Sequence, residues 1–168
     1  MRSRNIIVSA LVSVAVGLGA YAQQKTGRVK ALTAVDHAEI YQLYGHYYWS
    51  ADNGADNCLA WANLFTPDAV FYVGSKTAAT GREELAAFCR TGTGPAPRHY
   101  GTNFHWDASP EGARGGAYNL LLSQYEPNKP RTIATTVAYE DILVKTRDGW
   151  RFKQRRSTAN VLPSPSLP

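Results

Sequence analysis

The chain has 168 residues, 44 % of them hydrophobic, and a formal net charge of +5. This length is enough for one domain with a real core, and the sequence contains no internal repeat and no second domain. The basic residues gather in 145–156, where they alternate with apolar residues as on a solvated strand, so we expect no nucleic-acid binding.

Residues 1–22 have the features of a secretory signal peptide. A basic start precedes the apolar run 6–16, and Ala20-Tyr21-Ala22 fits a small-x-small cleavage site before Gln23. The alternative is a retained membrane anchor, for which the apolar run is short. We therefore expect a periplasmic or secreted protein that is not bound to the membrane after cleavage, with its charge lowered to +3 by the loss of two arginines.

A polar linker, 23–32, leads to the first expected helix. Thr33 and Asp36 have the spacing of a capping box. Apolar residues then recur at helical spacing, and Asn53-Gly54 ends the pattern. The helical positions are Ile40, Leu43, Tyr44, Tyr47 and Ala51.

The middle of the chain mixes helices and one strand. We expect a short helix over 58–65, ended by Thr66-Pro67, and then a strand over 69–74. A third helix over 80–90 is entered through Gly81.

From Pro97 onward the pattern is strand-like. Four runs, separated by turn residues, cover 98–107, 114–125, 131–145 and 150–158. Helices followed by antiparallel hairpins predict an α+β domain over 33–160. We expect a curved antiparallel sheet that forms a half-open cone, with three helices packed over its concave face and a cavity between them. The Pro/Ser-rich tail, 161–168, needs no packed structure.

The two cysteines, Cys58 and Cys89, both lie in expected helices. Export would permit a disulfide bond between them, and the alternative is a pair of buried thiols. The sequence alone does not show whether their Cα atoms lie close enough for a disulfide bond. The four histidines and two cysteines show no metal-ligand spacing, so we expect no metal and no cofactor.

The stretch "PRHYGTNFHW", 97–106, alternates like a strand with two different faces. One face carries His99, Asn103 and His105, and the other carries aromatic residues. Those aromatic residues are Tyr100, Phe104 and Trp106.

Several motifs resemble the SnoaL-like branch of the nuclear-transport-factor-like superfamily over about residues 33–158. They are "WSADNGADNCLAWANLFTPDAVF", "TGREEL", "RHYGTN" and "YEDILVKTRDGWRFKQR". "HYGTN" is similar to the histidine strand of lindane dehydrochlorinase, and the branch resembles this enzyme and scytalone dehydratase. The resemblance implies that Asp52, at the end of the first helix, pairs with His99.

Two departures from these enzymes stand out. The second catalytic histidine of the dehydratase has no counterpart on the strand that contains Tyr118, and Tyr47 replaces the helix lysine of the dehydrochlorinase. Asp52 and His99 still make a chemically sensible pair, because a carboxylate orients the imidazole and stabilises its protonated form. The alternative is that Asp52 only caps a loop and that His99 is a structural histidine.

The remaining candidates follow from Asp52 and His99. Tyr48 lies one helical turn before Asp52 and would donate to a developing oxyanion. Asn103 shares the strand face of His99 and is the next candidate donor, and His105 lies nearer the rim. Four aromatic residues are expected to line the pocket or, equally, the core: Tyr44, Trp61, Phe65 and Tyr118. Arg155 matches a late arginine of the family and is expected to form a structural ion pair.

If the polar face of 97–106 lines the pocket, Tyr100, Phe104 and Trp106 point outward. An apolar patch of that kind predicts a homodimer or homotrimer.

The reading favoured by the sequence is an exported lyase, of dehydratase or elimination type, that acts on a small hydrophobic molecule. We expect an aromatic substrate, for instance a lignin-derived diaryl compound. The alternatives are a double-bond isomerase or cyclase that uses the same pair, and a non-catalytic protein that binds a hydrophobic ligand.

Overall fold

The computed structural model describes residues 29–92, 98–122 and 125–159. The expected signal peptide and the Pro/Ser-rich tail lie outside these residues. Among the described residues, no helix is both long enough and apolar enough to cross a membrane. The elements in chain order are α1 (Ala34–Asn53), the 3-10 helix η1 (Ala55–Cys58), α2 (Leu59–Ala62), β1 (Phe65–Val73), β2 (Lys76–Thr80), α3 (Gly81–Gly92), β3 (Arg98–Ser109), β4 (Gly112–Leu122), β5 (Ile133–Thr146) and β6 (Gly149–Ala159).

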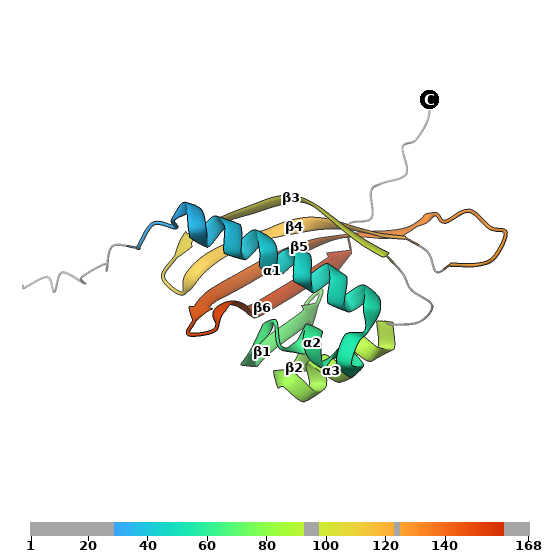
Figure 1. Cartoon of the computed structure of the whole chain (residues 1–168), viewed down its shortest axis with the longest axis horizontal. Coiled ribbons are helices and arrows are strands. Elements are labelled where there is room, and N and C mark those ends of the chain that lie inside the picture. Colours follow the sequence, from blue (N-terminus) through green and yellow to red (C-terminus); the bar gives the residue numbers. More distant parts are fainter. Residues whose placement is uncertain (1–28, 93–97, 123–124, 160–168) are drawn as a thin grey trace, which may run out of the picture.

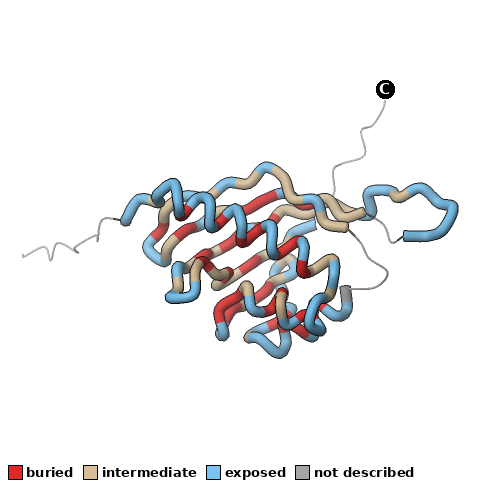
Figure 2. Tube along the Cα trace, viewed as in Figure 1, coloured by how far each residue is buried: buried red, intermediate tan, exposed pale blue. Residues whose placement is uncertain are grey.

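The six strands form one curved sheet, and α1 crosses one face of it (Figure 1). The strand order is β2-β1-β6-β5-β4-β3. Strands β3 to β6 pair antiparallel in sequence, as predicted, whereas β1 pairs parallel with β6. Figure 2 shows that the buried residues gather where α1 and the smaller helices cover the sheet. The predicted α+β cone with helices on its concave face is confirmed.

Helix α1 begins and ends where the sequence predicted. Thr33 and Asp36 form the reciprocal capping box, and Gly54 adopts a left-handed conformation at the C-terminal cap. Three tyrosines on its inner side are buried, namely Tyr44, Tyr47 and Tyr48. The helix therefore brings several aromatic rings onto the sheet.

The second predicted helix is much shorter than expected. It covers only Leu59–Ala62, and Phe65 already begins β1. The preceding residues Asp56, Asn57 and Cys58 have φ values of 52°, 53° and 66°, a left-handed path that an α-helix from Cys58 could not follow. Cys58 is joined to Cys89 of α3 by a disulfide bond, which ties this turn to α3. Strand β2 was not anticipated.

Strand β3 contains a β-bulge that reverses the predicted faces of its second half. Pairing with β4 is regular up to Thr102 and resumes at His105 with one extra residue in β3, where Asn103 has φ 53°. Residues after the bulge therefore change sides.

The aromatic patch expected on the outside of β3 is largely absent as a result. Phe104 and Trp106 pack against Tyr44 of α1, with ring centroids at 5.4 Å and 5.6 Å. Tyr100, which precedes the bulge, remains exposed. The expected homo-oligomer was to bury Tyr100, Phe104 and Trp106, and only the first of these three lies on the outer face.

Candidate active site

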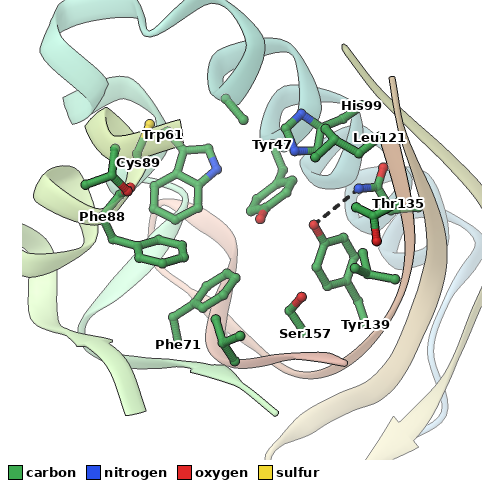
Figure 3. Close-up of a pocket in the computed structure, with 15 residues that line it drawn as sticks. Tyr47, Trp61, Phe71, Phe88, Cys89, His99, Leu121, Thr135, Tyr139 and Ser157 are labelled. Carbon is green, nitrogen blue, oxygen red and sulfur yellow. Dashed lines mark hydrogen bonds between the residues drawn. The ribbon is translucent and has the colours of Figure 1, made fainter. Parts of the chain in front are cut away.

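A cavity of about 210 Å³ lies between the helices and the concave face of the sheet. It is framed by α1, α2 and α3 on one side and by strands from β1 to β6 on the other (Figure 3). Its apolar wall consists mainly of Trp61, Phe71, Val73, Phe88, Leu121 and Val137. Its polar groups come mainly from Tyr47, His99, Asn119, Thr135, Tyr139 and Ser157.

Asp52 and His99 are hydrogen-bonded to each other at the edge of this cavity. The distance from His99 Nδ1 to Asp52 Oδ1 is 2.6 Å, and the two side chains are only 18 % and 11 % exposed. The backbone N–H of His99 also donates to both carboxylate oxygens, at 3.2 Å. When Asp52 is ionised, Nδ1 must be the donor, so the second ring nitrogen of His99 is left with its lone pair.

Each member of the pair is held by a different element. Asp52 lies in the last turn of α1, which Gly54 ends, and His99 is the second residue of β3. Arg98 donates to the backbone oxygen of Asp52 at 3.3 Å, which joins the strand to the helix end a second time. The ring of His99 stacks on that of Tyr48, with centroids 6.3 Å apart.

Tyr48 packs against the ring of His99 and does not line the cavity. Its hydroxyl is buried and has no hydrogen-bond partner among the described residues. The ring lies against Gly101, where an added Cβ would come within 2.2 Å of Tyr48 Cε2. Burial raises the pKa of Tyr48 well above that of a free tyrosine. This placement differs from the oxyanion-donor position expected from the sequence.

Tyr47, one residue earlier, reaches the cavity instead. Tyr47 and Ala51 are one helical turn apart and both line it, whereas Tyr48 and Asp52 face β3. The sequence identified Tyr47 only as a core position and as a departure from the family. Side-chain periodicity placed both tyrosines on the inner side of α1 but did not set the rotation of the helix over the sheet.

Of the four aromatic candidates for the pocket wall, only Trp61 lines the cavity. Tyr44 is fully buried and donates its hydroxyl hydrogen to Asp141, and Phe65 lies in the core beside Trp61 and Phe152. Tyr118 is 51 % exposed, because its strand turns the neighbouring residue Asn119 inward.

The two other polar candidates on β3 also lie away from the cavity. Asn103 is the bulge residue, is exposed, and accepts a hydrogen bond from Thr102 at 2.8 Å. His105 follows the bulge and is exposed. The extra residue in β3 is the physical reason that neither shares the inner face of His99.

Asn119 and Tyr139 supply polar groups that the sequence did not single out. Asn119 is 1 % exposed, and its Nδ2 donates to the Tyr139 hydroxyl over 3.5 Å, while its Oδ1 has no partner among the described residues. Burial raises the pKa of Tyr139 far above its usual value, so this phenol remains a neutral hydrogen-bond donor. One sequence signal could have identified Asn119. It is an asparagine next to Tyr118 in an expected strand, on the opposite strand face from Tyr118.

The described residues contain no group of three or more His, Cys, Asp or Glu side chains that could hold a metal ion. The polar groups of the cavity wall include an imidazole with its carboxylate partner and several hydrogen-bond donors. Such a set can move a proton and polarise a carbonyl oxygen.

Comparison with known proteins agrees with this architecture. The sequence profile of the SnoaL-like domain matches residues 33–156. No curated protein matches the chain. An NTF2-like protein with a cystatin-like fold from Novosphingobium aromaticivorans is 20 % identical, with 77 % of this chain and 85 % of that one covered and a TM-score of 0.66.

Two further solved structures share the fold. A putative scytalone dehydratase from the same organism is 23 % identical over 76 % of this chain and 85 % of its own, with a TM-score of 0.64. A protein from Catenulispora acidiphila, in complex with S-DNPA, is 24 % identical over 76 % of this chain and 95 % of its own, also with a TM-score of 0.64. At these identities the likeness shows the fold.

Proposed function

Because this chain belongs to the SnoaL-like domain family, we propose that it is a lyase of dehydratase or elimination type. In this proposal it acts on a small hydrophobic, ring-containing molecule and uses Asp52 and His99 for proton transfer. The family and fold support a small-molecule cavity with isomerase or dehydratase chemistry. The assignment to a lyase, as one reaction within that range, is what we propose beyond the family and fold.

The observation that carries the proposal is the 2.6 Å hydrogen bond between His99 and Asp52 at the wall of a mainly apolar cavity. A cavity that only holds a hydrophobic ligand has no need of an ionisable pair, whose desolvation is costly. An oriented imidazole that faces a substrate is what general base catalysis requires.

The reaction would start with removal of a proton from a carbon next to a carbonyl group. The free ring nitrogen of His99 takes the proton, and the electron pair of the broken C–H bond moves to the carbonyl oxygen. Asp52 stabilises the resulting imidazolium. The enolate then re-forms its carbonyl and expels a β-hydroxyl group, which leaves as water after it receives the proton from His99. Return of the same proton to a different carbon would instead give an isomerase.

Tyr47 is the donor that this proposal assigns to the developing oxyanion. It lines the cavity, and its ring lies 5.4 Å from that of Trp61 between centroids. A neutral phenol can donate to an anionic oxygen without first losing its proton. Tyr47 replaces Tyr48 and Asn103 in that role.

Deuterium exchange tests the proton-transfer step without knowledge of the natural substrate. The probe is 4-hydroxyacetophenone, a single ring whose methyl protons are acidic because they lie next to a carbonyl group. We expect the wild-type protein to accelerate exchange of these protons in D₂O, as followed by NMR. His99→Ala should abolish the acceleration, and Asp52→Asn should reduce it by roughly 10²-fold or more.

His105→Ala is the matched control, because His105 lies on the same strand but is exposed and away from the cavity. It should exchange the probe at the wild-type rate. If the wild-type protein binds the probe without accelerating exchange, or if His99→Ala matches the wild type, the acid–base assignment is wrong. The protein would then be better described as a hydrophobic-ligand-binding protein.

The proposal also retains export. The disulfide bond between Cys58 and Cys89 supports it, since disulfides persist in oxidising compartments and are rare in the cytosol. Mass spectrometry of the protein from its native host tests this directly. A mature chain that starts at Gln23 is expected, whereas an intact Met1 in the cytosolic fraction would contradict export.

A further inference from the structure

Two buried polar atoms in the cavity wall have no hydrogen-bond partner among the described residues. They are the Oδ1 atom of Asn119 and the Nε1 atom of Trp61. Both side chains are almost fully buried, at 1 % and 2 % exposure. Buried polar groups in folded proteins are nearly always paired, so two such groups in the wall of one cavity point to a ligand that pairs with them.

One of the two atoms accepts a hydrogen bond and the other donates one. Asn119 uses its Nδ2 to donate to Tyr139, which leaves Oδ1 as an acceptor. The indole N–H of Trp61 can only donate. Asn119 comes from β4, in the sheet, and Trp61 from α2, among the helices that cover it, so the two residues belong to different walls of the cavity. A ligand that satisfies both must therefore donate a hydrogen bond at one end and accept one at the other.

Neither side chain can easily turn away to find another partner. The Trp61 ring packs against Phe65 and Tyr47, with centroids at 4.7 Å and 5.4 Å, and Asn119 lies in the regular part of β4, opposite Gly101. The unpaired atoms are thus fixed features of the wall.

The size of the cavity limits what lies between them. A protein cavity of about 150 Å³ holds one benzene molecule, and this cavity has about 210 Å³. That leaves room inside the cavity for one ring with small substituents. The cavity wall also includes Phe71 and Phe88, whose rings lie 4.9 Å apart between centroids and suit the face or edge of an aromatic ring.

We propose that Asn119 and Trp61 are specificity-determining residues that select a single hydroxylated ring with a carbonyl or other oxygen acceptor. The ring hydroxyl donates to Asn119 Oδ1, and the acceptor oxygen receives the indole N–H of Trp61. The inference deepens the proposed function and rests on it for the reaction that follows binding. The recognition step itself rests only on the cavity.

Two probes of equal shape test the hydroxyl. In 4-methylacetophenone a methyl group replaces the hydroxyl of 4-hydroxyacetophenone, so the ring can no longer donate. The wild-type protein should bind the hydroxyl compound at least tenfold more tightly, as measured by calorimetry or NMR titration. Asn119→Leu should remove this difference. Trp61→Phe should weaken both compounds by the same factor, because both retain the carbonyl group.

Tyr118→Phe is the matched control, since Tyr118 is adjacent in β4 but points to the outer face. It should keep the wild-type preference. The wild-type comparison does not depend on whether any variant folds. Equal affinity of the two probes for the wild type, no binding of either at millimolar concentration, or an undiminished preference in a folded Asn119→Leu protein would each overturn the proposal.

Binding and exchange separate this inference from the proposed function. If the hydroxyl preference holds while deuterium exchange is absent, the acid–base chemistry fails and the recognition by Asn119 stands. If exchange occurs and depends on His99 while the preference is absent, the assignment of Asn119 fails and the chemistry stands.

Discussion

Replacement of Arg155 by methionine should be among the most destabilising single substitutions in the core. The Arg155 side chain is completely buried, and its Nε and Nη2 atoms donate to the two carboxylate oxygens of Asp141, each at 2.7 Å. Its guanidinium carbon also lies 4.1 Å from the centroid of the Tyr47 ring and 4.2 Å from that of Tyr139. Burial by itself would lower the pKa of Arg155, but Asp141 more than compensates and the pKa lies above its usual value.

The size of the effect follows from what the substitution leaves behind. Methionine removes the cation and both charge-assisted hydrogen bonds, so among the described residues the buried carboxylate of Asp141 retains only the hydroxyl of Tyr44 as a side-chain partner. Breaking a buried ion pair in this way costs about 3–5 kcal/mol. Domains of this size have a total unfolding free energy of roughly 5–15 kcal/mol, so the loss is a large fraction of it.

Urea unfolding followed by circular dichroism measures the free energy of unfolding of each variant. Arg147→Met is the control, because the Arg147 side chain is 94 % exposed and lies 3.3 Å from the carboxylate of Asp148; it should lose less than about 1 kcal/mol. The double variant Asp141→Leu/Arg155→Met should recover much of the stability, since no unpaired charge remains. A loss below about 1 kcal/mol for Arg155→Met alone would refute this reasoning.

Three further predictions concern packing, the disulfide bond and the buried phenols. Gly101→Ala should destabilise the protein by about 1–3 kcal/mol, because the new Cβ would lie 2.2 Å from Tyr48; unchanged urea unfolding would contradict this contact. The double serine variant of Cys58 and Cys89, which are 31 residues apart, should lose roughly 3–4 kcal/mol by loop entropy, and an unchanged melting temperature would count against the bond. Because burial raises the pKa of Tyr139, the folded state favours its neutral phenol. The stability that this phenol contributes is present below about pH 10 and is lost as the pH rises further. Phenolate absorbance in a titration with base should therefore show Tyr139 ionising only when the protein unfolds. Ionisation of every tyrosine before unfolding would refute the burial of Tyr139.

Much of the fold was predictable because its signals are local. The capping box of Thr33 and Asp36 and the glycine at position 54 set the two ends of α1, and turn residues separate the four long strands. Export remains a prediction, since the residues that carry it lie outside the described structure. The short second helix shows the limit of local patterns, because the left-handed path through Asp56, Asn57 and Cys58 cannot be read from apolar spacing.

The candidate site was predictable only in part. Asp52 and His99 were identified through a resemblance of short motifs, and the structure brings them to 2.6 Å. Trp61 was also identified as a wall residue. Tyr47, Asn119 and Tyr139 were not identified as site residues, since core tyrosines and an inward polar residue on a strand look alike in sequence whether or not a cavity lies beside them.

By itself, then, the sequence determined the class of fold, the limits of most elements and the identity of the histidine–carboxylate pair. Tertiary structure decided which side chains meet the cavity. One extra residue at Asn103 reversed the faces of β3 and sent Phe104 and Trp106 inward, and the rotation of α1 over the sheet selected Tyr47 in place of Tyr48. A bulge or a rotation changes every later side-chain direction, yet it depends on packing against segments that are distant in the chain.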